Sequence, residues 1–525
     1  MSDNRHHGLP MDDSQREVIA FLRDPSSYPQ DAGPVEVVET HASIVFLAGK
    51  YAYKLKRAVK YPYLDFSTTA RRLAACTAEL KLNRRTAPQL YLEVRAICRD
   101  SDGSLVWRHG VGDPLDYVVV MQRFDQHDLL DAVARQSGQS GLSVPLIHAL
   151  TAHVAGFHAK AEKLPERGGS AAMEKVARDN LGVLRECRPA GFAAAQIDRL
   201  DSLLRSELAR VASLLDERRA AGKVRRCHGD LHLRNVCLVG GKPVLFDCIE
   251  FSEEIASIDV LYDLAFLLMD LGHRGHHGFA NLALNRYLDL TEEDDGLAAM
   301  PLFLALRAAI RAHVTATMAE HGWSGEDANA AFAEARGYLD DAEAALASQP
   351  ARLIAVGGLS GTGKSTLAAR LAGELGRAPG ARMLRSDVLR KLRFGAEPET
   401  PLPPEAYASD FTQLVYRDLC ARAARALRAG YSAVIDAVAL GEDERRAFAA
   451  VAAAAGVPFT GLWLEAPPDA LIARVGRRHG DASDASREVI EQQLLCDPGA
   501  LDWTRIEAGG DADATLMAAR RALLH

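Results

Sequence analysis

Hydrophobic and polar residues change their spacing several times along the chain, and each change marks a different kind of element. The short runs VEVVET, IVFLAG and YAYKLKR are rich in Val, Ile, Phe and Tyr, which predicts strands. From about Thr68 to Arg85 the apolar residues return every three or four positions, which predicts a helix. DYVVVMQRF predicts a further buried strand, and the stretch from about Leu129 to Arg219 is helical almost throughout.

A hairpin and then a second set of elements follow. VCLVGGKPVLFDCIEF predicts two strands with their turn at Gly240 and Gly241, and helices resume from about Asp259 to Ala347. After Pro350, which breaks a helix, strands and helices alternate. The strands are RLIAVGG, RMLRSD, SAVIDAV and FTGLWLEA, so this region is expected to form a parallel α/β sheet.

Length and composition narrow the class of protein. A chain of 525 residues is too long for one ordinary core. It is 48% hydrophobic with a net charge of −8, which is typical of a globular protein and disfavours general nucleic-acid binding. The N-terminus lacks the apolar region of a signal peptide, no apolar run is long enough for a membrane span, and the cysteines show no CxxC spacing. We therefore expect a cytoplasmic protein with reduced thiols.

The stretch HGDLHLRN carries the first candidate chemistry. Phosphoryl transfer needs a carboxylate near the acceptor hydroxyl, ligands for magnesium and a cation on the nucleotide phosphates. Asp230 is predicted to accept or orient the proton of the acceptor, and Asn235, in the same loop, to ligate magnesium. Asp247 follows at the end of an apolar strand and is predicted to be the second magnesium ligand.

A lysine upstream supplies the cation. Lys54 lies in the middle of a predicted strand, and Glu79 in the next helix could hold it in place. Lys56 projects from the same strand face and is the alternative. The segment ETHASIVFLAG stands where a glycine-rich loop would be, and Ser43 is the expected phosphate-side residue there.

HGDLHLRN, FDCIEF and IDVLYDLAFLLMDL together resemble the aminoglycoside phosphotransferase family, whose members share the bilobal fold of protein kinases. The resemblance covers roughly residues 35–345. It implies that Asp230 is catalytic, that Asn235 and Asp247 bind magnesium, and that Asp259 supports the site.

A second nucleotide site is predicted by GLSGTGKS, which has the form G-x-x-x-x-G-K-S between an apolar strand and a helix. In such a loop the backbone N–H groups surround the β-phosphate, Lys364 reaches the β- and γ-phosphates, and Ser365 ligates magnesium. The residues expected to bind nucleotide here are Gly358, Ser360, Gly361, Thr362, Gly363, Lys364, Ser365 and Thr366.

Carboxylates and arginines beyond this loop help to predict which reaction the second site performs on its nucleotide. Asp436 ends the strand AVID and is the expected metal-side acid, and Ala437 after it disfavours a motor ATPase, which normally has Glu there. Asp387 follows the second strand and is predicted to orient an acceptor hydroxyl. Arg474 and Arg477 share one helix face, which is either a lid over the nucleotide or a solvated basic surface.

This second set resembles the small P-loop kinases, such as gluconate kinase and the zeta-toxin-like kinases, over residues 350–525. The whole chain resembles bacterial fusions of an aminoglycoside phosphotransferase-like domain and an ATP-binding domain. We therefore expect an N-terminal tail and first helix over residues 1–34, an α+β bilobal kinase-like domain over residues 35–345, and an α/β P-loop NTPase domain with a parallel sheet.

The expected function is transfer of phosphate from ATP, with Mg²⁺, to a hydroxyl of a small polar molecule. The alternatives are a nucleotide-sensing regulatory protein, and a toxin-like or nucleic-acid end kinase in the C-terminal domain. The small-molecule acceptor is the partner that we expect, without a membrane or nucleic acid.

Overall fold

The chain forms two compact units, which we describe separately from a computed structural model. The structure describes residues 15–29, 32–40, 42–61, 64–108, 114–136, 138, 141–187, 190–322, 325–397, 400–476 and 483–523. The first unit comprises Met1–Asp270 and Leu302–Ala344, and the second comprises Leu271–Pro301 and Ala345–His525. The segment Leu271–Pro301 thus packs in the second unit, although the sequence places it between helices of the first.

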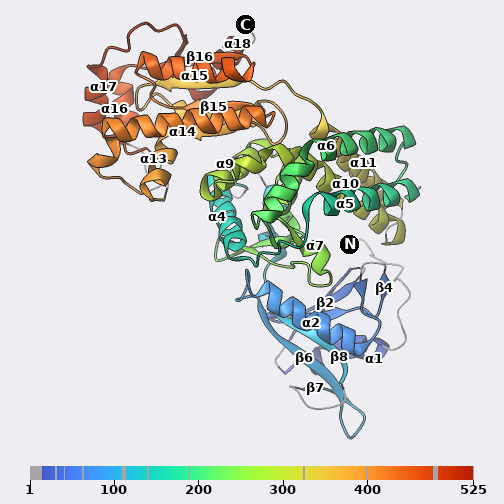
Figure 1. The fold of residues 1–525 in the computed structure, drawn as a ribbon. Coiled ribbons are helices and arrows are strands. Elements are labelled where there is room, and N and C mark those ends of the chain that lie inside the picture. Colours follow the sequence, from blue (N-terminus) through green and yellow to red (C-terminus); the bar gives the residue numbers. More distant parts are fainter. Residues whose placement is uncertain are drawn as a thin grey trace. The chain divides into compact units, whose positions relative to one another are not determined.

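The first unit begins with a six-stranded antiparallel sheet in the order β1-β2-β3-β8-β6-β7. Its strands are β1 (Glu36–Glu39), β2 (Ser43–Ala48), β3 (Tyr51–Lys56), β6 (Tyr91–Arg99), β7 (Leu105–Arg108) and β8 (Pro114–Gln122). Helix α2 (Thr69–Asn83) lies along one face of this sheet (Figure 1). Side chains of β2, β3 and β8 on the other face form a core with helix α1 (Arg16–Arg23).

The rest of the first unit is mainly helical and carries the HGDLHLRN loop on two short strand pairs. Antiparallel β9 (Val224–Arg226) and β12 (Ser257–Asp259) form one pair, and β10 (Val236–Val239) and β11 (Lys242–Leu245) form the other. The helices are α3 (Leu130–Ala134), α4 (Val144–Lys160), α5 (Gly169–Glu186), α6 (Ala194–Ala220), α7 (Glu253–Ala256), most of α8 (Val260–His273) and α10 (Met300–Gly322), and α11 (Gly325–Leu346).

The second unit is built on a five-stranded parallel sheet in the order β14-β15-β13-β16-β17. Its strands are β13 (Leu353–Gly358), β14 (Arg382–Arg385), β15 (Ala433–Asp436), β16 (Phe459–Glu465) and β17 (Thr504–Glu507). The helices are α9 (His277–Thr291), α12 (Lys364–Glu374), α13 (Ser386–Phe394), α14 (Ser409–Arg428), α15 (Glu442–Ala455), α16 (Pro468–Gly476), α17 (Arg487–Leu494) and α18 (Ala512–Ala522). Helix α14 runs beside β15, the second strand of the sheet (Figure 1).

These two sheets confirm the predicted fold class, a kinase-like α+β part followed by a parallel α/β part. Hydropathy alone also makes the helical stretch Glu293–Glu320 long and apolar enough to span a membrane, but 72% of its most apolar window is buried inside the protein. Core packing therefore accounts for its apolar character.

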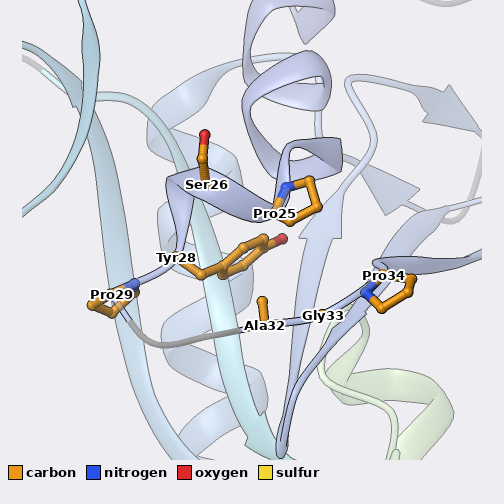
Figure 2. Close-up of a pocket in the computed structure, with 7 residues that line it drawn as sticks. All are labelled: Pro25, Ser26, Tyr28, Pro29, Ala32, Gly33 and Pro34. Atoms are coloured by element: carbon orange, nitrogen blue, oxygen red, sulfur yellow. The ribbon is translucent and has the colours of Figure 1, made fainter.

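A shallow hollow lies in the N-terminal segment of the first unit (Figure 2). The ring of Tyr28 packs on Tyr53 with centroids 4.9 Å apart, and the Tyr28 hydroxyl donates a hydrogen bond to the carbonyl of Leu22. The hollow is lined by Pro25, Ser26, Tyr28, Pro29, Ala32, Gly33 and Pro34. None of these residues is charged or belongs to a candidate site, so the candidate chemistry lies elsewhere.

Candidate active sites

In the HGDLHLRN loop, Asn235 orients Asp230 by hydrogen bonds. The side-chain nitrogen of Asn235 donates hydrogen bonds to the carboxylate and to the backbone carbonyl of Asp230, both at 2.9 Å. The Nε2 atom of His232 lies 3.3 Å from the same carboxylate. Because the amide nitrogen of Asn235 faces Asp230, its Oδ1 atom remains available as a metal ligand.

The buried carboxylate of Asp263, on α8, accepts hydrogen bonds from the backbone of this loop. Asp263 accepts hydrogen bonds from the backbone N–H groups of His228 at 3.0 Å and Gly229 at 2.8 Å. The Nε2 atom of His158 lies 3.0 Å from Asp263, and the Arg307 guanidinium lies 4.0 Å away. The side chain of Asp263 is fully buried, so these contacts fix the backbone just before Asp230.

Asp259, which the family resemblance implied as the supporting residue, makes different contacts. Its carboxylate forms a bidentate pair with Arg218 at 2.8 and 2.9 Å, and it accepts the N–H of Leu261. Asp259 therefore ties the end of β12 to helix α6, while Asp263 contacts the loop. The sequence contained Asp263 in IDVLYDL, but nothing in that pattern indicates which of the two acids faces the loop.

Two lysines of β3 meet the same glutamate. The Nζ atom of Lys54 lies 2.8 Å from Glu79 and 2.5 Å from Asp247. The Nζ atom of Lys56 contacts the other Glu79 oxygen and lies 2.5 Å from Glu250. Only Lys54 of the two is paired with Asp247, the predicted metal ligand. Lys56 was predicted as the alternative to Lys54, whereas Glu250, which lies three positions after Asp247 in FDCIEF, was not predicted.

Nearby cationic groups keep Glu79 and Asp230 ionised. Burial acts to raise the pKa of Glu79, but Lys54 and Lys56 outweigh it and lower that pKa to about 2. Burial likewise opposes ionisation of Asp230, but interactions with His232 and Arg311 hold the pKa of Asp230 well below its usual range. Both groups are therefore carboxylates at neutral pH.

Strands β1 and β2 form a hairpin at the place in the chain where kinases have a glycine-rich loop. Ser43 is the first residue of β2 and is buried, and its backbone N–H donates to the Oγ1 atom of Thr40 at 3.0 Å. Ser43 is paired across the sheet with Lys56, two residues beyond Lys54. The hairpin thus leads into the strand next to the lysine, as a phosphate-side segment would.

The oxygen donors of this site suit magnesium. The side chain of Asp247 is 41% exposed, and its backbone is held at a φ of 60°, which non-glycine residues rarely adopt. Its N–H donates to the Tyr91 hydroxyl at 3.1 Å. With Asn235 Oδ1, Asp247 would supply the hard oxygen ligands that Mg²⁺ prefers, while water and phosphates complete its coordination.

In the second unit the loop GLSGTGKS joins β13 to α12, as predicted. Gly358, Gly361 and Gly363 have φ angles of 131°, 90° and 92°, which side chains other than hydrogen rarely allow. A Cβ atom on Gly361 would lie 2.8 Å from the carbonyl of Leu471. The Nζ atom of Lys364 donates to the carbonyl of Leu359 at 3.0 Å. The loop therefore has the backbone shape of a phosphate cradle at a helix N-terminus.

The two acids predicted for this site, Asp387 and Asp436, lie just after β14 and at the end of β15, where Arg385 also lies. The Arg385 guanidinium donates to Ser365 Oγ at 3.2 Å and lies 3.3 Å from Asp436. Asp387 lies in the first turn of α13, and burial together with the nearby charge of Asp436 raises the pKa of Asp387. Ser365, Asp436 and Asp387 thus form a group of oxygen atoms beside the loop, suited to Mg²⁺ and to an acceptor hydroxyl.

Other loop and lid residues are placed as follows. Thr362 Oγ1 donates to the carbonyl of Leu359 at 2.8 Å, and Thr366 is exposed on α12. Arg474 donates to the backbone carbonyls of residues 508, 509 and 510, so it holds the segment between β17 and α18. Arg477 lies outside the described residues.

A glutamine on α17 reaches the phosphate loop, and sequence reasoning missed it. Gln493 accepts the backbone N–H of Ser360 at 2.9 Å and donates to Ser360 Oγ at 3.2 Å. Asp484, which precedes α17, accepts hydrogen bonds from Lys391 at 2.9 Å and from the Tyr407 hydroxyl at 2.6 Å. No spacing rule links residues so far apart in the chain to the loop.

Comparison with known proteins matches a family to each of two parts of the chain. Residues 60–302 match the phosphotransferase enzyme family, and residues 353–495 match a family described as an AAA domain. Uncharacterized proteins of Mycobacterium bovis and Mycobacterium tuberculosis are 30% identical to the chain over 465 residues, which is 87% of this chain and 88% of theirs. The chain belongs to their family. In this chain a phosphotransferase-family domain is joined to a P-loop kinase domain.

Solved structures of kinases are similar to portions of this chain. An amicoumacin kinase is 15% identical and covers 63% of this chain and 93% of its own, with a TM-score of 0.37. A gluconokinase from Sinorhizobium meliloti is 21% identical and covers 33% of this chain and 92% of its own, with a TM-score of 0.25.

Proposed function

We propose that the first unit transfers the γ-phosphoryl group of ATP, with Mg²⁺, to a hydroxyl of a small polar molecule. The observation that carries the proposal is the position of Lys54, whose Nζ atom lies 2.8 Å from Glu79 and 2.5 Å from Asp247. Such a lysine, held by a helix glutamate beside a metal-binding aspartate, is the arrangement that a kinase needs at the nucleotide phosphates.

Each residue then has one role. Lys54 neutralises charge on the nucleotide phosphates, and Asn235 and Asp247 hold the magnesium ion. Asp230, ionised and oriented by Asn235, accepts or directs the proton of the acceptor hydroxyl. The acceptor oxygen forms the new bond to phosphorus, the bond from phosphorus to the leaving ADP oxygen breaks, and the acceptor proton passes to Asp230 or through it to water.

For the second unit we propose a P-loop kinase site in which Asp387 orients the acceptor hydroxyl. Arg385 supports this role, because its guanidinium contacts both Ser365 and Asp436. Arg385 ends β14, two residues before Asp387. A nucleotide-sensing role is the second candidate, favoured by Gln493, which occupies the backbone N–H of Ser360 in the phosphate loop.

Transfer of labelled phosphate from ATP to acceptor molecules tests both proposals. The full chain is incubated with labelled ATP, Mg²⁺ and fractions of a metabolite extract, and the labelled products are identified. We expect two product classes, one lost in Asp230→Asn and the other in Asp387→Asn. If no labelled product forms while nucleotide binding persists, the protein is a nucleotide sensor and the kinase proposal is wrong. If products form but neither variant loses one, the roles assigned to Asp230 and Asp387 are wrong.

A further inference from the structure

The segment Leu271–Pro301 belongs by sequence to the match with the phosphotransferase family, yet it packs in the second unit. It consists of the end of α8, helix α9 and the short helix η6 (Glu293–Ala299). Its contacts in the second unit include β14, α12, α13 and α14, and α12 begins at the phosphate loop.

A fully buried arginine of β14 is neutralised by this segment. Arg382 has no exposed surface, and its guanidinium donates to Asp294 at 2.7 Å and to Asp289 at 2.7 Å. A third contact runs to Asn285 Oδ1 at 3.1 Å. Asp294 also accepts a hydrogen bond from Arg422 of α14 at 2.9 Å. Without α9 and η6, Arg382 would be a buried charge without its two carboxylate partners, which is strongly unfavourable.

Two asparagines of α9 cover the open edge of the sheet. Strand β14 is the edge strand, so its outward backbone groups have no neighbouring strand. Asn285 Oδ1 accepts the N–H of Met383 at 2.8 Å, and Asn281 Nδ2 donates to the carbonyl of Ala381 at 2.9 Å. The amides thus take the place that another strand would fill.

The backbones of α9 and α12 also approach closely. A Cβ atom added to Gly373 of α12 would lie 3.3 Å from the Cα atom of Gly278. The segment is therefore fitted against both the helix that follows the phosphate loop and the strand that leads to Asp387.

Strand β14 connects these contacts to the candidate site residues Arg385 and Asp387. Arg385, three residues after Arg382 and thus about 10 Å along the strand, contacts Ser365 and Asp436. Asp387 follows directly in α13. A shift of β14 along or away from β15 would move both residues relative to the phosphate loop, and displacements near 1 Å matter for reacting groups.

We infer that α9 and η6 form a positioning segment of the second kinase site, which fixes β14 so that Arg385 and Asp387 face the phosphate loop. The inference rests on the function proposed for the second unit. It also means that a fragment starting at Pro350 would lack the partners of Arg382 and the cover of its edge strand.

Hydrogen–deuterium exchange of the full chain tests the inference. In Asp289→Asn and in Asn285→Ala, amides of residues 382–394 should exchange at least tenfold faster than in the wild type. Amides of β13 and of α12 should keep their rates, and AMP-PNP with Mg²⁺ should bind with unchanged stoichiometry. Asp295→Asn, an exposed position of η6, is the matched control and should change nothing.

A kinetic measurement separates positioning from stability. In a background of Asp230→Asn, which silences transfer at the first site, Asp289→Asn should lower second-site turnover per bound nucleotide by about tenfold or more, while the KM for ATP changes less than twofold. Unchanged exchange in residues 382–394, or an equal rise throughout the second unit, would overturn the inference. If the parent releases no ADP but the exchange result holds, the kinase proposal fails and the positioning of β14 stands.

Discussion

Replacing Asp263 with asparagine removes the support of the catalytic loop while keeping its shape. In the wild type the two carboxylate oxygens accept the N–H groups of His228 and Gly229 and contact His158. The asparagine side chain has one acceptor oxygen, so its NH₂ group must face one of these N–H groups, which then loses its hydrogen bond. The loop just before Asp230 is expected to shift.

The size of the effect follows from these contacts. A buried N–H without an acceptor costs about 1–3 kcal/mol, and the loss of charge from the remaining hydrogen bonds adds about 1 kcal/mol. The free energy of unfolding of the first unit should therefore fall by about 2–4 kcal/mol. Turnover at the first site should fall by about 10²-fold per folded molecule, because general-base catalysis depends on the placement of Asp230.

Asp259→Asn is the matched control, since Asp259 is also buried and paired but contacts Arg218. Breaking that pair should cost about 3–5 kcal/mol of stability and leave turnover per folded molecule near the wild-type value. Urea unfolding and release of ADP, both in a Lys364→Ala background, give the two quantities. If Asp263→Asn keeps its turnover, or if both variants lose it equally, our interpretation of the loop is wrong.

Three further predictions concern the first unit. Asp230→Asn should keep ATP affinity, measured by calorimetry, and lower transfer by about 10²-fold or more; wild-type turnover would exclude Asp230 as the catalytic residue. Lys54→Met should abolish transfer with little change in stability. Lys56→Met should mainly lower stability, because it leaves Glu250 buried without its lysine. The opposite pattern in parallel turnover and urea assays would mean that Lys56, and not Lys54, contacts the nucleotide phosphates. Burial and the nearby Arg311 lower the pKa of His313 from 6.5 to about 4, so the unfolded chain binds the proton first and stability should fall as the pH drops from about 6.5 to about 4. His313→Gln should flatten that dependence in urea titrations, and an unchanged slope would contradict it.

The sequence was sufficient for the parts of the fold that repeat a local pattern. Glycines and a lysine at fixed spacing after an apolar strand predicted the phosphate loop, and the structure has that loop between β13 and α12. Strand β17 was missed because only Ile506 of its four residues is buried, so TRIE shows no regular alternation. Strand β6 was also missed, although the apolar Leu92, Val94, Ala96 and Cys98 alternate there with other residues.

Contacts between distant segments could not be predicted. Asp259 and Asp263 are both acids near the start of one helix, and only the fold decides that Asp263 faces the loop. Periodicity predicted helix α9, but it cannot tell which core a helix joins. The partners of Asp289 lie on a strand more than 90 positions later, and no local signal connects them.

The central claim is that the chain holds two separate nucleotide sites, and calorimetric titration with AMP-PNP and Mg²⁺ tests it most directly. Lys54, Asn235 and Asp247 lie in the first unit, and Lys364, Ser365 and Asp436 lie in the second. We predict two binding sites in the wild type and one in each of Asp247→Ala and Lys364→Ala. One site in the wild type, lost in both variants, would contradict the claim.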